Sequence, residues 1–416
     1  MSEEKKLVPK LRFPEFRGAV GWKERPLSKL MSESRLPGSK GNVAKKITVK
    51  LWGNGVFEKN GSSPGSINTQ YFKRKAGQFI YSKLDFLNQA FGIIPPNLDN
   101  FESTVDLPCF DFSDELNPVF LLEYVKRRDF YERLGETADG SRKARRIHAE
   151  TFLSFPIALP SPAEQQKIAD CLSSLDELIA AQACKVDALK THKKGLMQQL
   201  FPREGETQPR LRFPEFQGAT AWTMEKLENL AKRGSGHTPS KSVPEYYGGG
   251  VKWVSLADSK RLDAGLISET ETNISELGIK NSSAVLHPAG TVLISRDAGV
   301  GKSAVMAVPM AVSQHFIVWV CDNQKLCNWF LYYLLQFMKP IFERIATGST
   351  IKTIGLPFFK ELSTAVPSVS EQQRIADCLT SLDSLITAAT QELETLKTHK
   401  KGLMQQLFPA AEAVEA

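Results

Sequence analysis

Two segments of the sequence come close to catalytic motifs, and each lacks a residue that the chemistry needs. Gly299-Val300-Gly301-Lys302-Ser303 matches the end of a phosphate-binding P-loop, in which glycine N–H groups and a lysine hold nucleotide phosphates. The full pattern requires a glycine at position 296, where the chain has arginine. Asn117-Pro118-Val119-Phe120 approaches the Asn-Pro-Pro-aromatic motif of adenine methyltransferases, but the second proline and a glycine-rich loop for S-adenosylmethionine are missing. The sequence therefore predicts neither nucleotide binding nor methyl transfer by this chain.

The histidines and cysteines indicate no metal site and no nucleophile. No two of the six cysteines form a Cys-x-x-Cys pair, and their spacing fits neither a zinc site nor a disulfide framework. The six histidines are scattered, and there is no nucleophile elbow or metal-binding histidine pair. We predict a non-catalytic chain with no metal and no cofactor of its own. A self-sufficient DNA methyltransferase or nuclease with an unfamiliar site stays open as the alternative, and S-adenosylmethionine binding by the purified chain would favour it.

The composition indicates a cytoplasmic globular protein. Apolar residues make up 42% of the chain and charged residues 24%, which is typical of soluble domains. No uninterrupted apolar run approaches the roughly 20 residues that a membrane helix needs. No apolar signal segment follows the N-terminal charges, and the cysteines suit a reducing compartment. We therefore expect no membrane partner.

Positive charge is concentrated in two blocks of the chain. Residues 1–160 carry 26 Lys and Arg against 19 Asp and Glu, and residues 207–366 carry 17 against 13. The segments that follow them are slightly acidic, with 6 basic against 7 acidic residues in 161–206 and 4 against 7 in 367–416. A polyanion such as nucleic acid would therefore meet the two basic blocks.

Both basic blocks carry cations at places from which a side chain could reach DNA. Ser82-Lys83 and Ser295-Arg296 put a cation at the end of a predicted strand, within reach of a base edge. Glycine turns that place small hydroxyl residues beside cations suit contacts with phosphate. The candidate DNA contacts from these features are Lys73, Arg74, Lys75, Lys83, Ser141, Arg142, Lys143 and Arg145 in the first block, and Arg296, Ser349, Thr350 and Lys352 in the second.

The chain is one unit repeated twice, a globular domain followed by a long helix. Leu11-Arg12-Phe13-Pro14-Glu15-Phe16 recurs as Leu211-Arg212-Phe213-Pro214-Glu215-Phe216, at an offset of 200. Residues 160–202 match residues 367–409 at an offset of 207, with 30 of 43 positions identical. Such a repeat predicts duplicated architecture. The expected parts are a first domain (1–160), a first long helix and linker (161–206), a second domain (207–366), a second long helix (367–409) and a tail (410–416).

The two helical segments predict a coiled coil. Each begins with a capping-box pattern, Ser161-Pro162-Ala163-Glu164 and Ser368-Val369-Ser370-Glu371, and each ends at a proline. Apolar residues between these marks step by four and three positions, as in a heptad repeat. About 38 residues at 1.5 Å each give a rod of about 57 Å, and a two-fold relation between the domains would make the rods antiparallel. The predicted core residues are Ile168, Leu172, Leu175, Ile179, Ile375, Leu379, Leu382 and Ile386.

The basic blocks combine short apolar strands, glycine and asparagine turns, and a helix after the last strand of each. This mixture predicts an α+β fold class. We expect two globular domains in tandem, each followed by a long helix, the two helices pairing as an antiparallel coiled coil with pseudo-two-fold symmetry.

In this arrangement the chain resembles the specificity subunit of type I restriction-modification enzymes, over nearly all of residues 8–409. The second domain carries the strongest likeness. Its segments Gly236-His237-Thr238-Pro239-Ser240, Tyr246-Tyr247-Gly248-Gly249 and Lys252-Trp253-Val254 are similar to the opening of the family's domain, and Gln314-His315-Phe316 continues in the family's order. The first domain lacks the Thr-Pro-Ser opening. The resemblance adds Ser240, Lys241 and Tyr247 to the candidate DNA contacts.

The resemblance implies that each domain is a target-recognition domain, which reads one half of a split DNA sequence while the paired helices set the gap between the halves. It implies double-stranded DNA, two methyltransferase subunits and motor-nuclease subunits as partners. S-adenosylmethionine, ATP and Mg2+ would belong to those partner subunits, and the methyltransferase would flip an adenine out of the duplex. A coiled-coil adaptor with no DNA role is the second alternative, and a flat response of DNA affinity to salt would favour it.

Overall fold

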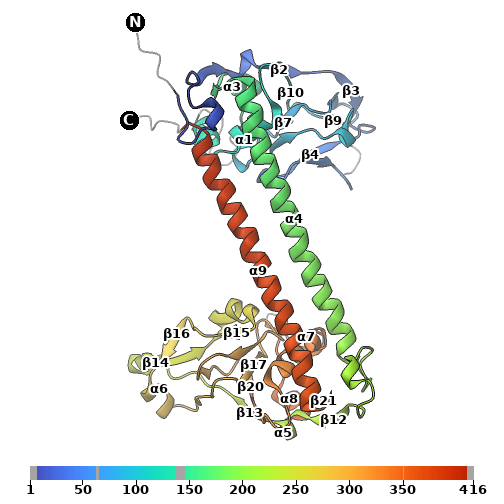
Figure 1. The fold of residues 1–416 in the computed structure, drawn as a ribbon, viewed down its shortest axis with the longest axis vertical. Coiled ribbons are helices and arrows are strands. Elements are labelled where there is room, and N and C mark those ends of the chain that lie inside the picture. The colour runs from blue at the N-terminus through green and yellow to red at the C-terminus, as the bar shows by residue number, and fades with distance from the viewer. Residues whose placement is uncertain (1–6, 62–64, 137–145, 350, 410–416) are drawn as a thin grey trace. The chain divides into compact units, whose positions relative to one another are not determined.

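The structure is a computed structural model that describes residues 7–61, 65–136, 146–349 and 351–409 (Figure 1). The chain forms two compact units, one made of residues 1–183 with 391–416 and the other of residues 184–390. Each of the two long helices, α4 (Pro162–Leu200) and α9 (Val369–Leu407), contributes one segment to each unit. Every unit therefore consists of one globular part and two helix segments.

A four-stranded antiparallel sheet organises the globular part of the first unit. Its strands run in the order β2 (Met31–Ser34), β10 (Cys109–Phe112), β7 (Phe79–Tyr81) and β8 (Phe91–Ile93). The rings of Phe79, Tyr81 and Phe110 are fully buried and pack against Phe152 of α3 (Ala149–Ser154). The other elements are β1 (Lys23–Pro26), β3 (Pro37–Lys40), β4 (Ile47–Val49), β5 (Val56–Glu58), β6 (Gln70–Lys73), β9 (Glu102–Ser103), α1 (Pro118–Val125), α2 (Arg128–Glu136) and β11 (Pro156–Leu159).

A five-stranded sheet organises the globular part of the second unit. Its order is β13 (Ala231–Ser235), β20 (Phe316–Cys321), β17 (Val292–Ser295), β18 (Ser303–Met306) and β15 (Leu266–Ile267). Helix α7 (Asn328–Ile345) buries Phe330, Tyr333 and Leu334 in the same core. The other elements are β12 (Thr223–Lys226), α5 (Leu227–Leu230), β14 (Tyr247–Val254), η7 (Leu256–Ala264), β16 (Thr272–Ile274), α6 (Glu276–Lys280), β19 (Ala311–Val312), α8 (Leu356–Glu361) and β21 (Ser363–Val366).

The two globular parts share a plan, as the sequence repeat predicts. The strand order β13-β20-β17 of the second unit repeats β2-β10-β7 of the first, and all of these neighbours are antiparallel. The pairs β1-β11 and β12-β21 are also equivalent. The predicted α+β class of tandem domains is confirmed.

A buried ion pair fastens the start of each domain to the start of a long helix. Arg12 donates two hydrogen bonds of 2.7 Å to the Glu164 carboxylate, which also accepts from the indole N–H of Trp22 at 3.2 Å. The Ser161 hydroxyl accepts from the Glu164 N–H, as the capping pattern predicts, so this carboxylate lies in the first turn of α4. Because the side chains of Arg12 and Glu164 are 7% and 1% exposed, little water screens the pair.

The second unit repeats this ion pair with equivalent residues. Arg212 donates to Glu371 at 2.9 and 2.6 Å, and the Trp222 indole donates to the same carboxylate at 3.3 Å. In both cases the hydrogen bond that the arginine donates to the carboxylate raises the pKa of the arginine. The repeated sequence therefore encodes a repeated tertiary contact.

The helix segments run antiparallel within each unit, which confirms the predicted pairing direction. In the first unit Lys400 Nζ lies 2.7 Å from Asp176 Oδ2, so the late part of α9 lies beside the early part of α4. In the second unit Lys193 Nζ lies 2.5 Å from Asp383 Oδ1, which pairs the late part of α4 with the early part of α9. None of the described helices is both long and apolar enough to cross a membrane.

The predicted core residues of the coiled coil divide into two classes of burial. Ile168, Leu172, Ile375 and Leu379 are at most 1% exposed because they also pack into the domain cores. Leu175, Ile179, Leu382 and Ile386 are half-buried. The four fully buried residues of this predicted set therefore lie where each helix meets a globular part.

Candidate nucleic-acid interface

In the second domain, the end of strand β17 and a later loop are joined through the backbone of Arg296. The Arg296 N–H donates to the carbonyl of His315 at 2.9 Å, and the Arg296 carbonyl accepts from the N–H of Ile354 at 3.0 Å. Residues 347 and 353 pair with each other, and residue 353 also pairs with Asp297. The structure thus brings the predicted contact Arg296 beside the loop that carries the predicted contacts Ser349 and Lys352, both exposed. Thr350 lies outside the described residues.

The opening segment of the second domain is held against the end of strand β19. The His237 N–H donates to the Val312 carbonyl at 3.0 Å, and a Cβ added at Gly236 would lie 1.7 Å from that oxygen. Only glycine allows this approach. The Trp253 indole donates to the His237 carbonyl, and the Tyr247 hydroxyl donates to the Pro239 carbonyl at 2.6 Å. Tyr247 is therefore occupied in fixing the segment.

Thr238 links this opening segment to the β17 end. Its side chain is hydrogen-bonded to Gln314, and the neighbouring His315 Nδ1 lies 2.8 Å from Asp297 Oδ2. These contacts connect Thr238, Arg296, Asp297, Gln314 and His315. The predicted contacts Ser240, Lys241, Ser349 and Lys352 are exposed on the segments that these residues join.

Arg296 is poised near a carboxylate without a close hydrogen bond to it. Its Nε lies 3.7 Å from Asp297 Oδ1, and both atoms are buried with no hydrogen-bond partner among the described residues. A buried donor left unpaired costs free energy, so a ligand that accepts a hydrogen bond from it gains binding free energy. Sequence reasoning missed Asp297 and His315, although the Gln314-His315-Phe316 segment was a signal that they share a site.

The P-loop-like segment is a tight turn between β17 and β18. Ala298, Gly299 and Gly301 have positive φ angles of 40°, 112° and 84°. The ammonium of Lys302 donates to the Ser259 carbonyl at 3.0 Å and to Asp263 at 2.9 Å, so its charge is bound within the domain. An open pocket of about 540 Å³ lies beside the turn and is lined by Ala298, Gly299, Val300, Lys302, Lys339, Glu343, Ile351 and Lys352.

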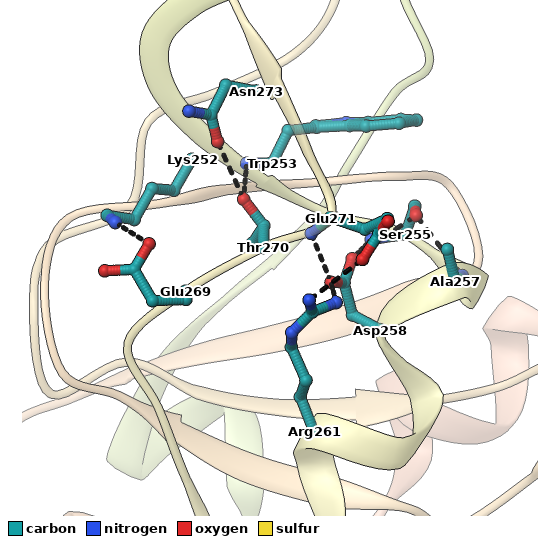
Figure 2. A network of polar contacts seen from close by, with 10 residues as sticks. All are labelled: Lys252, Trp253, Ser255, Ala257, Asp258, Arg261, Glu269, Thr270, Glu271 and Asn273. Atoms are coloured by element: carbon teal, nitrogen blue, oxygen red, sulfur yellow. Dashed lines mark hydrogen bonds and ion pairs between the residues drawn. The ribbon is translucent and has the colours of Figure 1, made fainter. Parts of the chain in front are cut away.

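In the same domain a buried carboxylate joins helix η7 to the sheet that contains β14 and β16 (Figure 2). Asp258 is 0% exposed and accepts from the Ser255 N–H at 2.9 Å, from Arg261 at 2.9 Å and from the Glu271 N–H at 2.7 Å. The Ser255-x-x-Asp258 spacing is a capping box, which the sequence displays and which our sequence reasoning missed. In the same network Lys252 is paired with Glu269.

The first domain repeats the strand-end arrangement of the second with different side chains. The Lys83 N–H donates to the Asp106 carbonyl at 2.9 Å, and the Lys83 carbonyl accepts from the Ile147 N–H at 3.0 Å. Arg146 forms a 3.0 Å ion pair with Asp106. Lys83 and Asp106 thus take the backbone places of Arg296 and His315. The predicted contacts Ser141, Arg142, Lys143 and Arg145 lie outside the described residues.

Arg74 does not face solvent, and we withdraw it from the candidate DNA contacts. It is 2% exposed, and its guanidinium donates to the Ser34 carbonyl at 2.7 Å and to the Ser103 hydroxyl at 2.8 Å. It also reaches the carbonyls of the loop before β10. Burial lowers its pKa. Its neighbours Lys73 and Lys75 point outward and are exposed, as alternation along an extended segment requires.

Replacing Arg74 by methionine should lower the free energy of unfolding of the first unit by about 2–3 kcal/mol, because several buried oxygens would lose their donor. Lys73→Ala should leave that free energy unchanged and weaken DNA binding instead. Urea unfolding and a DNA-binding titration of both variants distinguish the two roles. Loss of DNA affinity without loss of stability in Arg74→Met would contradict the structural role.

Residues 220–398 match the family model described as the type I restriction modification DNA specificity domain. The specificity subunit of the type I restriction enzyme MjaIX from Methanocaldococcus jannaschii is 30% identical over 189 residues, which cover 45% of this chain and 44% of that relative. The specificity subunit of EcoR124I/EcoR124II from Escherichia coli is 26% identical over 271 residues, 62% of each chain. The chain thus aligns with less than two thirds of these two relatives.

Two solved structures share the fold over nearly the whole chain. One comes from work on complex assembly and conformational transition of the type I R-M system, with a TM-score of 0.60, 17% identity, and coverage of 98% of this chain and 99% of that one. The other is the type I restriction-modification S subunit from M. genitalium, with a TM-score of 0.59, 16% identity, and coverage of 98% and 100%. The likeness to these chains is one of fold, with tandem α+β domains and two long helices. The chain is therefore similar to type I restriction-modification specificity subunits, both in the matched domain at residues 220–398 and in these relatives.

Proposed function

We propose that this chain is the DNA sequence-recognition subunit of a type I restriction-modification complex, in which each globular domain reads one half of a bipartite target. The observation that carries the proposal is the duplicated strand-end arrangement. In both domains a cationic residue, Lys83 or Arg296, is fixed through its own N–H and carbonyl between a neighbouring strand and a later loop. A cation held in this way can present donors to base edges or phosphates with little loss of entropy.

The two domains would read different half-sites. The residues in equivalent backbone places differ, with Lys83 and Asp106 in the first domain and Arg296 and His315 in the second. Arginine favours bidentate contact with guanine, whereas lysine is a point donor. Domains 1–160 and 207–366 therefore share a scaffold and differ in the groups that would discriminate bases.

The paired helices would set the spacing between the half-sites and bind the methyltransferase subunits. Leu178 and Leu385 occupy equivalent positions on the two helices, and each is 55% exposed. An added Cβ at the equivalent residues Gly195 and Gly402 would meet nothing within 4 Å. Matching exposed positions on both helices suit two copies of one partner.

The chemistry would belong to the partners. The chain would act in the cytoplasm on double-stranded DNA, and S-adenosylmethionine would be bound by two methyltransferase subunits that take the target adenine out of the duplex. ATP and Mg2+ would serve motor-nuclease subunits. The part of this chain would be to select the sequence and hold it in register.

Exchanging residues 207–366 for the second domain of another family member should change one half of the target and leave the other half intact. Each domain has its own core and its own strand-end arrangement, so its contacts should transfer with it. Mapping methylated adenines across a genome in the presence of the methyltransferase subunit measures both halves. A change in both halves, or in neither, would contradict the two-reader proposal.

A further inference from the structure

The first domain presents an exposed tryptophan at the tip of a two-stranded hairpin. Strands β4 and β5 are antiparallel, with Ile47 opposite Glu58 and Val49 opposite Val56, and residues 50–55 form the turn. Trp52 is 64% exposed and Leu51 is 40% exposed, whereas Trp22, Trp222, Trp253 and Trp319 are buried and Trp329 is half-buried. A large apolar side chain exposed at a tip suggests a binding role.

The backbone of the tip is strained and firmly anchored. Trp52 has a φ of 61°, a left-handed conformation that bulky residues rarely adopt. The N–H groups of Trp52 and Gly53 donate to the carbonyls of Asn88 and Gln89 at 2.8 and 2.9 Å. The strain is thus held in place by the neighbouring loop, and the indole is presented on a fixed base, so little entropy would be lost when it binds.

The hairpin carries several cations. Lys50 adjoins the tip, and Lys45 and Lys59 are exposed at the open end of the hairpin, where Glu58 is the nearest acidic residue in sequence. The ammonium of Lys50 lies 4.2 Å from the centre of the Phe57 ring, which is itself 43% exposed. An aromatic tip on a hairpin rich in lysine suits nucleic acid, because bases offer stacking surfaces and phosphates offer negative charge.

The tip is connected to the candidate DNA-reading residue of the same domain. Asn88, which accepts the Trp52 N–H, lies in the loop that follows Lys83. Within this loop Asp85 is hydrogen-bonded to both Ser82 and Asn88. The anchor of Trp52 and the strand end that presents Lys83 therefore belong to one hydrogen-bonded loop.

We propose that Trp52 inserts into the base stack of DNA beside the half-site read by the first domain, with Leu51 packing against the exposed base edge. The proposal rests on the proposed DNA-reading function. Apolar side chains that wedge between base pairs unstack one step and bend the duplex. Such a wedge would lower the work of extracting a nearby base, which a partner that acts on an extruded adenine requires.

The fluorescence of Trp52 provides a direct test, because it is the most exposed of the six tryptophans. The probe is a duplex with the sequence that adenine mapping assigns to the complex. The emission contributed by Trp52 is the difference between the unchanged chain and Trp52→Phe, both in complex with the methyltransferase subunit. On binding the duplex this emission should be quenched and should become inaccessible to acrylamide. Emission that stays accessible in the bound complex would overturn the proposal.

Affinity and DNA bending provide the second test. Trp52→Ala should weaken binding to the duplex by about 5- to 150-fold, the range found for removal of one base–aromatic stack, and should reduce the bend measured by energy transfer between the duplex ends. Trp52→Phe should retain most of both. Val20→Ala, which removes an apolar side chain that is 76% exposed elsewhere in the domain, should change neither.

The controls separate this proposal from the function on which it rests. If the unchanged complex fails to bind or methylate DNA, the proposed function is wrong, and the proposed insertion of Trp52 is wrong as well. If the unchanged complex binds DNA and Trp52→Ala binds and bends it equally well, only the wedge is wrong. Normal DNA binding by Trp52→Ala together with weakened assembly with the methyltransferase subunit would also overturn it, since the tip would then be a protein contact.

Discussion

Replacing Glu164 by alanine should lower the free energy of unfolding of the first unit by about 3–5 kcal/mol. The substitution leaves the Arg12 guanidinium buried without its carboxylate and also removes the acceptor of the Trp22 indole. A charge that loses its partner in a buried place keeps its desolvation cost and loses the attraction that offset it. Urea unfolding followed by a probe in each unit measures the effect, because a two-unit chain need not unfold in one step.

The repeat supplies matched controls for this experiment. Glu371→Ala removes the equivalent carboxylate, which is also 1% exposed, and should destabilise the second unit by a similar amount. Glu15→Ala removes an acidic residue of the same N-terminal segment as Arg12. The Glu15 side chain is 46% exposed and lies 3.3 Å from Lys167, so its loss should leave the unfolding transitions of both units unchanged. If Glu164→Ala left the stability of the first unit unchanged, as Glu15→Ala should, the buried ion pair would not be what holds the segment around Arg12 against helix α4.

The same ion pair marks the limit of what the sequence predicts. The repeat identifies Arg12 and Arg212 as equivalent, and likewise Glu164 and Glu371. The repeat does not show that each arginine pairs with a glutamate, because the partners are 152 or 159 residues apart in sequence. They meet only when the segment that carries the arginine packs on the first turn of the long helix. The heptad pattern, by contrast, predicts the two long helices, since local periodicity determines which face of a helix is apolar.

Arg74 shows a different kind of limit. A run of three cations suggested a single basic patch, but alternation along an extended segment turns Lys73 and Lys75 outward and Arg74 inward. A count of charges does not reveal which of the three side chains is buried, whereas the two-residue alternation of a strand separates Arg74 from Lys73 and Lys75. Asp297 and His315 lie 18 residues apart and meet across neighbouring strands, so only the strand register brings their side chains together.

Gly236→Ala should strongly reduce discrimination at the second half-site. An added Cβ would lie 1.7 Å from the carbonyl oxygen of Val312 and 2.3 Å from its carbon, distances that the backbone must relieve by moving. That movement breaks the His237–Val312 hydrogen bond and carries Thr238 away from Gln314. We expect the preference for the target over a duplex with a scrambled second half-site to fall by about 100-fold, the scale expected when several base contacts are lost together.

Gly250→Ala is the matched control for this substitution, because an added Cβ at Gly250 meets nothing within 4 Å. It should preserve the preference for the second half-site. The preference for the first half-site should survive in both variants, since that half depends on the other domain, and the domain exchange identifies which half is which. Equal binding and equal discrimination by Gly236→Ala and the unchanged chain would mean that the opening segment takes no part in reading DNA. Loss of the first half-site as well would mean that the two domains do not read independently.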